Sequence, residues 1–277
     1  MTCRGQLLDF NKPLTMGIIN LTDDSFYAGS RIQEESKLLQ KVGQMQEEGA
    51  RFIDLGACST RPGSQPVDSG LERERLVQGI TSVKKAFPEL LISADTFRAD
   101  VAEAAAKAGA DMINDVGCGK LDPRMYEAVA GLGLPYILMH NRGPSEQMKE
   151  LSEYRDVVND VVLELSQQLD RLYAMGVADV IIDPGFGFSK TVEQNFELLM
   201  RLDELQVLDC PILAGLSRKS MVWRSLNTGP EHALNGSTAL HMLALERGAQ
   251  LLRVHDVREA SEAILLWERC RSYQRPV

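Results

Sequence analysis

An aspartate stands where a run of strand-forming residues meets a glycine-rich loop. Residues 180–188 read VIIDPGFGF, so three β-branched residues lead directly into Asp183. Such a run is typical of a strand buried on both faces, and the proline and glycines that follow end the pairing and free the backbone. A carboxylate is costly to bury without partners, so we expect Asp183 to meet a polar ligand or a hydrogen-bond network. A helix N-cap or turn aspartate is the alternative for this motif alone.

Polar side chains also end the other apolar runs of the chain. In order, these strand ends carry Asn20, Ser59-Thr60-Arg61, Asp95, Asn114, His140-Asn141-Arg142, Asp183, Lys219, and Arg253 with His255. Ser, Thr, Asp and Asn are common helix caps and turn formers, which accounts for part of this series. Lysine, arginine and histidine are poor caps, so the last three residues indicate a site.

The series divides into two chemical groups. A mixture of carboxylate, amide and ammonium groups could bind the edge of a flat nitrogen heterocycle through paired donors and acceptors. This first group is Asp95, Asn114, Asp183 and Lys219. Arginine forks and hydroxyl groups suit a phosphate or a pyrophosphate. This second group is Arg61, Arg253, His255, Ser217 and Ser220, beside which Asn20 and Asp24 offer oxygens of the kind that Mg2+ takes.

An alternation of apolar runs and helical patterns must position these residues. We predict strands at 14–19, 52–56, 90–94, 112–113, 135–139, 180–182, 212–216 and 251–256, and helices at 34–48, 70–87, 99–108, 123–130, 154–175, 192–205, 233–247 and 257–272. Eight such units in about 250 residues predict a closed (β/α)8 barrel, an α/β fold whose site lies at the carboxyl ends of the strands. An open doubly wound sheet is the alternative, which strand count and length disfavour. We predict a single domain over 1–277, with the residues before 14 as a small strand or plug over the barrel base.

Composition restricts the class of protein. The chain has 277 residues, 44% of them hydrophobic, and a net charge of −9, which fits a globular domain and argues against binding to nucleic acid or anionic membranes. There is no signal-peptide pattern and no apolar run of membrane-spanning length. The five cysteines are scattered without zinc spacing, so we expect reduced thiols and a cytoplasmic location.

The ordered strand-end motifs resemble those of the dihydropteroate synthase family. They are MGIINLTDDSF from residue 16, STRPG from 59, DT from 95, IND from 113, LMH from 138, DPGFGF from 183, GLSRKS from 215 and RVHDV from 253. A lone DPGFGF would be suggestive only, whereas eight ordered matches are highly specific. The resemblance runs from about residue 14 to the final helix.

The resemblance implies a transferase of folate biosynthesis and a sulfonamide target. Such an enzyme joins p-aminobenzoate to 7,8-dihydropterin-6-ylmethyl diphosphate, which gives 7,8-dihydropteroate and pyrophosphate. The carbon–oxygen bond would break largely before the amine attacks, so that catalysis is mainly charge stabilisation. The resemblance also implies Mg2+ as cofactor and a homodimer formed through late helices, for which 233–247 and 257–272 are candidates.

The roles of individual residues follow from the matching positions. By resemblance, the pterin ring is held by Asp95, Asn114, Met139, Asp183 and Lys219. The diphosphate is held by Asn20, Arg253 and His255, with Asn20 as ligand of Mg2+. The p-aminobenzoate lies against Thr60, Arg61, Phe188 and Ser220. The residues expected to act in catalysis are Asn20, Asp24, Arg61 and Lys219.

Departures from the family pattern are confined to loops. Asp23 replaces a usual proline, residues 27–30 read YAGS where a second aspartate and a glycine pair are common, and Cys58 precedes Ser59 where glutamate is common. One alternative function is a corrinoid-linked methyltransferase domain that binds methyltetrahydrofolate, but such a domain has no need of the diphosphate residues. Another is a non-catalytic pterin- or folate-binding paralogue, which would be expected to lose loop residues first. Asn20, Asp24, Thr60 and Arg61 remain, which favours the synthase.

Overall fold

A closed ring of parallel strands forms the centre of the molecule. The structure is a computed structural model that describes residues 1–21, 31–58, 67–144, 147 and 150–273. The barrel strands are β3 (Leu14–Asn20), β4 (Phe52–Gly56), β5 (Leu91–Asp95), β6 (Met112–Asp115), β7 (Tyr136–Met139), β8 (Val180–Asp183), β9 (Leu213–Ala214) and β10 (Leu251–Val254). Their order is β8-β7-β6-β5-β4-β3-β10-β9, and a parallel bridge between Ile182 and Ile212 joins the two ends. The predicted (β/α)8 barrel is therefore confirmed and the open sheet is wrong.

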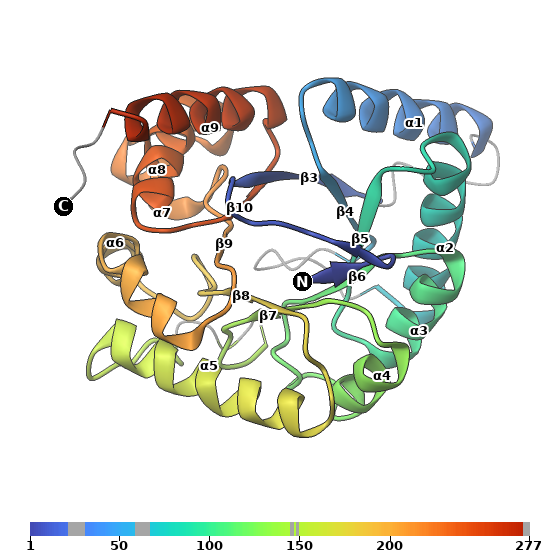
Figure 1. Cartoon of the computed structure of the whole chain (residues 1–277), viewed down its shortest axis with the longest axis horizontal. Coiled ribbons are helices and arrows are strands. Elements are labelled where there is room, and N and C mark those ends of the chain that lie inside the picture. Colours follow the sequence, from blue (N-terminus) through green and yellow to red (C-terminus); the bar gives the residue numbers. More distant parts are fainter. Residues whose placement is uncertain (22–30, 59–66, 145–146, 148–149, 274–277) are drawn as a thin grey trace.

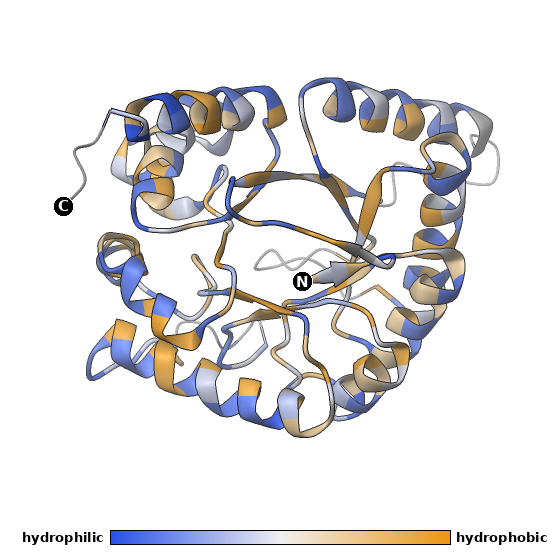
Figure 2. Ribbon diagram, in the orientation of Figure 1, coloured by the Kyte–Doolittle hydropathy of each residue, from blue (hydrophilic) through white to orange (hydrophobic). Residues whose placement is uncertain are grey.

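Helices surround the strands on all sides (Figure 1). They are α1 (Arg31–Glu47), α2 (Ser69–Ala86), α3 (Ala99–Ala108), α4 (Met125–Leu132), α5 (Val157–Ala174), α6 (Val192–Met200), α7 (Ser220–Ser225), α8 (Leu234–Glu246) and α9 (Val257–Arg271), with 3-10 turns at Leu202–Leu208 and Pro230–His232. Figure 2 shows that hydrophobic residues of the helices lie mainly toward the strands, which is the amphipathic pattern of a barrel's outer layer. None of the helices in the described residues has the length and apolar character needed to cross a membrane.

The helix ends differ from the predicted ones where local hydrogen bonds decide them. The helix predicted over 154–175 begins only at Val157, because Asp156 caps it by accepting from the backbone N–H groups of Val158 and Asn159. The helix predicted over 192–205 ends at Met200 and continues as a 3-10 turn. The short helix α7, which directly follows Lys219, was not predicted at all.

An apolar floor closes the amino-terminal end of the barrel. Every barrel strand contributes one inward side chain to it: Met16, Phe52, Leu91, Met112, Ile137, Ile181, Leu213 and Leu251. An antiparallel hairpin of β1 (Thr2–Cys3) and β2 (Gln6–Leu7) lies over the middle of the barrel (Figure 1), and Cys3, Leu8 and Phe10 pack on the floor. The predicted plug over the barrel base is confirmed. Because this end is filled, a ligand has to enter the barrel from the carboxyl ends of the strands.

Candidate active site

Polar residues form a second layer inside the barrel, above the apolar floor. Side chains alternate along a strand, so the residue two positions beyond a floor residue again points inward. Four polar residues stand two positions beyond a floor residue, and Asp95 stands four positions beyond one. We call this set the polar layer: Asp54, Asp95, Asn114, Asp183 and Arg253. Asp54, Asn114 and Asp183 are buried, whereas Asp95 and Arg253 keep 12% and 18% of their side-chain surface exposed. Among the described residues, the layer therefore presents polar groups at the end of the barrel opposite the apolar floor.

Arg253 binds two carboxylates from neighbouring strands. Its Nε donates to Oδ2 of Asp54 at 2.6 Å and its Nη2 donates to Oδ2 of Asp95 at 2.6 Å. Oδ2 of Asp54 also accepts from Nδ2 of Asn114 at 3.0 Å. The sequence grouped Arg253 with the phosphate-binding residues, but in space its guanidinium belongs to the acidic part of the polar layer. Its role at the diphosphate stays a prediction.

The carboxyl of Asp95 has a raised pKa. Burial is the main cause and brings the pKa to about 7, with the charge of Arg253 acting to lower it and that of Asp54 acting to raise it. A carboxyl with such a pKa is common at functional sites, where desolvation and a specific charge partner act together. Asp95 is therefore a candidate functional residue, and its role at the pterin stays a prediction.

Asp183 and Lys219 form the opposite side of the site. Oδ1 of Asp183 accepts from the backbone N–H of Gly185 at 2.7 Å, so the turn interpretation of this aspartate is correct for one of its oxygens. Burial raises the pKa of Asp183 and the charge of Lys219 lowers it. Burial also lowers the pKa of Lys219 to about 8, and the charges of Asp183, Arg253 and Asp95 act on it too. The predicted residues Asp95, Asp183 and Lys219 thus belong to one electrostatic unit.

The loop after Asp183 is held by lysines. Lys219 Nζ donates to the carbonyl of Phe186 and lies 4.7 Å from the centre of the Phe188 ring. Lys190 Nζ lies 3.1 Å from the carbonyl oxygens of both Gly185 and Phe188. Phe188, predicted to contact p-aminobenzoate, is therefore held beside Lys219.

Lys190 was not predicted from the sequence, and its position directly after DPGFGFS was the one signal available.

His255 lies at the end of β10 and contacts Ser217 in the loop that follows the neighbouring strand β9. Its Nδ1 is 3.1 Å from Oγ of Ser217, and its backbone N–H donates to the same oxygen at 3.2 Å. The neighbouring Arg218 binds the carboxylate of Asp256 through Nε at 2.9 Å and Nη2 at 2.7 Å. The two strand ends β9 and β10 are therefore joined, and Arg218 is occupied in joining them. Ser220 follows at the first position of α7.

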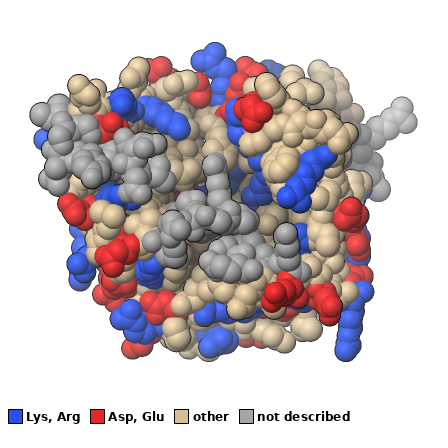
Figure 3. Space-filling model, turned by 180° about the vertical axis from the view of Figure 1, so that it is seen from behind, with Lys and Arg blue, Asp and Glu red and all other residues tan. Residues whose placement is uncertain are grey.

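The remaining predicted residues are only partly placed by the structure. Met139 is buried at the end of β7, in register with Asp183. Asn20 is exposed at the end of β3, in register with Gly56. Asp24, Thr60 and Arg61 lie outside the described residues, so their predicted roles stay predictions. Figure 3 views the molecule from behind the hairpin and shows Lys and Arg side chains toward the middle of that face.

Comparison with known proteins decides the family. A family model described as "Pterin binding enzyme" matches residues 16–255. Dihydropteroate synthase of Escherichia coli is 39% identical over 267 residues, which cover 96% of this chain and 94% of the relative. This chain belongs to the dihydropteroate synthase family.

Solved structures of dihydropteroate synthases have the same fold. The Yersinia pestis enzyme in complex with a sulfonamide drug matches with a TM-score of 0.91 and 39% identity, covering 98% of this chain and 99% of that one. The Xanthomonas albilineans enzyme with 4-aminobenzoic acid matches with a TM-score of 0.89 and 37% identity, covering 98% of both chains. The resemblance read from the strand-end motifs is therefore confirmed.

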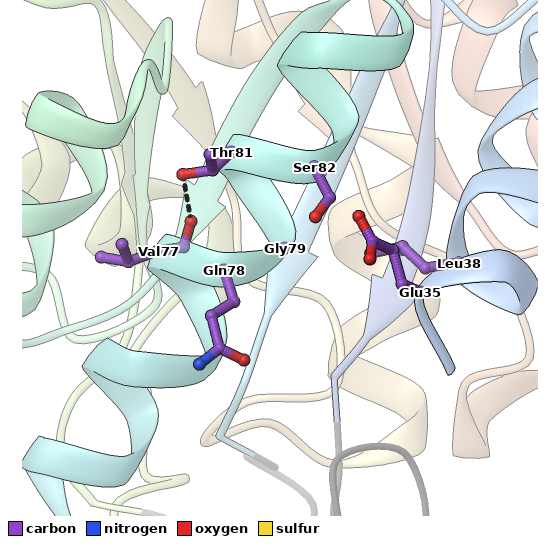
Figure 4. Close-up of a pocket in the computed structure, with 7 residues that line it drawn as sticks. All are labelled: Glu35, Leu38, Val77, Gln78, Gly79, Thr81 and Ser82. Atoms are coloured by element: carbon purple, nitrogen blue, oxygen red, sulfur yellow. Dashed lines mark hydrogen bonds between the residues drawn. The ribbon is translucent and has the colours of Figure 1, made fainter. Parts of the chain in front are cut away.

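Surface cavities lie apart from the polar layer of this dihydropteroate synthase family member. A cavity of about 320 Å³ lies between α1 and α2 on the outside of the barrel (Figure 4). It is lined by Glu35, Leu38, Val77, Gln78, Gly79, Thr81 and Ser82. In this cavity Thr81 donates to the carbonyl of Val77 at 2.7 Å, which is an ordinary contact within a helix. It shares no residue with the polar layer and holds no group suited to the chemistry predicted there.

Proposed function

We propose that the chain synthesises 7,8-dihydropteroate from p-aminobenzoate and 7,8-dihydropterin-6-ylmethyl diphosphate, releasing pyrophosphate. The observation that carries this proposal is the polar layer above a sealed apolar floor, in which Asp95, Asn114 and Asp183 lie at the carboxyl ends of their strands and the charge of Lys219 interacts with Asp183 and Asp95. Dihydropteroate synthase relatives support it, as do Xanthomonas albilineans structures that hold 4-aminobenzoic acid in one case and 7,8-dihydropteroate in another.

The pterin ring would be read by paired donors and acceptors. Its pyrimidine edge carries N–H donors and a carbonyl acceptor, which match carboxylate oxygens and an ammonium group. Asp183 and Lys219 provide such a pair in one corner of the site, and Asp95 and Asn114 provide acceptors in another. Met139 is buried between them at the end of β7 and offers an apolar, polarizable contact for the ring.

The substitution itself would proceed mainly by charge stabilisation. The bond between the methylene carbon and the diphosphate oxygen breaks, and the electron pair leaves with pyrophosphate. The amine of p-aminobenzoate then forms the carbon–nitrogen bond and loses a proton. The carboxylate of Asp183, and that of Asp95 once it is ionised, would favour the pterin cation, because both groups are held in place in a water-poor site before the bond breaks.

Binding of Mg2+ beside the diphosphate is part of the proposal. The amide oxygen of Asn20 is the kind of hard ligand that Mg2+ takes, and its exposed position at the end of β3 leaves it accessible from the barrel mouth. Within the described residues, no group of three or more His, Cys, Asp or Glu could hold a metal alone. This donor set fits an ion that substrate phosphates and water would help to hold. Bound there, Mg2+ would supply positive charge to the departing pyrophosphate.

The p-aminobenzoate would lie on the outer side of the pterin. Phe188 and Ser220 would contact p-aminobenzoate, since Lys219, whose ammonium group lies 4.7 Å from the centre of the Phe188 ring, directly precedes Ser220 at the start of α7. Thr60 and Arg61 would complete the subsite. A sulfonamide carries a similar aromatic amine, so we expect sulfonamides to compete here, as the complex of the Yersinia pestis enzyme with such a drug suggests.

A homodimer and a cytoplasmic location complete the proposal. Leu243 on α8 and Leu265 and Leu266 on α9 expose 40%, 56% and 61% of their surface, although the two helices pack against each other. Exposed leucines on the predicted late helices support association through this face, which sedimentation equilibrium would test. The five cysteines are all free thiols, which supports a reducing compartment.

Genetic complementation tests the function in a cell. The gene should restore growth without added folate products to a bacterium that lacks its own dihydropteroate synthase. The Lys219→Ala variant, expressed to the same level, should not. Absence of growth with the wild-type chain, together with normal expression, would contradict the proposed activity.

A further inference from the structure

Asp54 is a fully buried carboxylate in the middle of β4, outside every motif of the family resemblance. It points into the barrel two residues beyond the floor residue Phe52. One of its oxygens, Oδ2, accepts hydrogen bonds from Asn114 at 3.0 Å and from Arg253 at 2.6 Å. Both partners come from other strands, 60 and 199 residues away in sequence. Asp54 thus joins β4, β6 and β10 at the depth of the polar layer.

The contact with Asn114 determines which end of that amide faces the ligand. A carboxylate paired with a guanidinium offers acceptors, so it can bind only the NH2 end of a neighbouring amide. The carbonyl oxygen of Asn114 is then the end turned away from Asp54. An asparagine without such a neighbour can present either end. Asp54 therefore fixes the orientation of the Asn114 amide, so that its carbonyl oxygen is the atom available to accept a hydrogen bond from a ligand.

The contact with Arg253 fixes the charge partner of Asp95. The guanidinium binds Asp54 through Nε and Asp95 through Nη2, each at 2.6 Å. Its plane is consequently held by two carboxylates on adjacent strands, β4 and β5. Asp54 lies on the buried side of this bridge and Asp95 on the more exposed side. Without Asp54, the guanidinium of Arg253 would lose one of the two carboxylates that hold it, and its contact with Asp95 would no longer be fixed.

We propose that Asp54 is a positioning residue for pterin recognition, which orients the carbonyl oxygen of Asn114 and the guanidinium of Arg253 toward the ligand. It acts through these two residues, because it has no exposed surface of its own. The ligand class that follows is a heterocycle with an N–H donor edge opposite Asn114 and Asp95. The inference rests on the proposed function for the choice of a pterin as ligand.

A swap of functional groups tests this role more specifically than removal. In Asp54→Asn, the amide oxygen can still accept from Asn114 and Arg253 in place of Oδ2, but the negative charge facing Arg253 is lost. The new NH2 group takes the buried place of Oδ1, which has no hydrogen-bond partner among the described residues, and so becomes an unpaired buried donor. In the double variant Asp54→Asn with Asn114→Asp, one carboxylate and one amide again face each other, and residue 114 still presents an oxygen to the ligand. Ser93→Ala is the matched control, because Ser93 is buried on the neighbouring strand in register with Asp54 and its hydroxyl has no hydrogen-bond partner among the described residues.

The experiment measures pterin binding and aminobenzoate use separately. Calorimetry with 7,8-dihydropterin-6-ylmethyl diphosphate and Mg2+ gives the first, and the KM for p-aminobenzoate at saturating pterin gives the second. We expect Asp54→Asn to weaken pterin binding by roughly 10-fold to 100-fold, the cost of an unpaired buried donor, with the KM for p-aminobenzoate unchanged within about twofold. The double variant should bind the pterin at least about tenfold more tightly than the weaker-binding of its two component variants, Asp54→Asn and Asn114→Asp. Ser93→Ala should bind as the wild type does.

Several results would overturn the proposal. Unchanged pterin binding in Asp54→Asn is one, and an equal loss of pterin binding and aminobenzoate use is another. Absence of rescue in the double variant is a third. Unfolding of both Asp54 variants while Ser93→Ala stays folded would make Asp54 a residue of folding and would also overturn it. Calorimetry needs no turnover, so a wild-type chain that binds the pterin but forms no pteroate would contradict the proposed function and leave this test intact.

Discussion

The ammonium group of Lys190 lies 3.0 Å from Nδ1 of His140, beneath the loop that links Asp183 to α6. Burial lowers the pKa of His140 to about 3, with the charge of Lys190 acting in the same direction, and burial lowers the pKa of Lys190 to about 7. A neutral imidazole with an unprotonated Nδ1 can accept from the ammonium group. The pair therefore forms a buried support for the loop that carries Phe188.

Removal of the Lys190 ammonium group should loosen this loop. Lys190→Met keeps the length of the side chain but loses its bonds to the carbonyl oxygens of Gly185 and Phe188. We expect the KM for p-aminobenzoate to rise about tenfold, with a smaller effect on pterin binding, since Phe188 moves while Asp183 stays in its strand. Steady-state kinetics checks this. Lys120→Met removes a more exposed lysine near the same cluster and should leave both values close to wild type.

Pterin binding should pass through a maximum as pH changes. Raising the pH through about 7 ionises Asp95, which then becomes a full acceptor for ring N–H groups. Raising it further through about 8 discharges Lys219 and removes the partner of Asp183. The affinity should therefore increase from pH 6 to pH 7.5 and decrease above pH 8.5, as calorimetry across this range would measure. Asp95→Asn should remove the acidic limb only. An affinity independent of pH in the wild type would contradict the assignment of both groups.

Lys219 should be indispensable for pterin binding. Lys219→Ala removes the cation that lowers the pKa of the buried Asp183 most, and leaves that carboxylate only the weaker charges of Arg253 and Lys190. Removal of one partner of a buried charge pair costs several kcal/mol, so we expect binding of the pterin diphosphate to fall below detection in calorimetry. Tight binding retained by this variant would exclude the role given to Lys219. Lys107→Ala, at the exposed end of α3, provides a control for surface charge.

Gly185 should not tolerate a side chain. Its φ is +70°, and an added Cβ would lie 2.0 Å from the carbonyl oxygen of His140. The left-handed backbone alone costs roughly 1 to 3 kcal/mol for a residue other than glycine, and the contact adds to it. Gly185→Ala should therefore lower the free energy of unfolding by at least about 2 kcal/mol in a denaturant titration. Gly131→Ala in α4 meets no atom within 4 Å and should be neutral or stabilising by up to about 1 kcal/mol.

Site residues at the ends of strands could be predicted from the sequence, whereas site residues within strands were missed. Asp183 and Asp95 could be found because an apolar run stops at each of them. Asp54 lies within the run FIDLG, and a strand buried on both faces shows no alternation that would reveal which residues point inward. Arg253 was found, but its pairing with Asp54 joins residues 199 positions apart and could not be predicted. The pairing of Arg218 with Asp256 escaped prediction for the same reason.

The barrel itself was predictable because each of its units repeats a local pattern. Glycines after helical patterns marked the helix ends correctly, as at Gly109, whose φ of +108° closes α3. Helix α7 was missed because six residues are too few to show a helical period. Strand β9 was predicted too long, since only Leu213–Ala214 pair as a strand.

Pyrophosphate release tests the proposed reaction at its chemical step. The purified chain would be incubated with 7,8-dihydropterin-6-ylmethyl diphosphate and Mg2+, with and without p-aminobenzoate. We predict that release depends on p-aminobenzoate and that one 7,8-dihydropteroate forms for each pyrophosphate. Binding of the pterin without release, or release that p-aminobenzoate does not accelerate, would contradict a synthase and point to a pterin-binding protein without this activity.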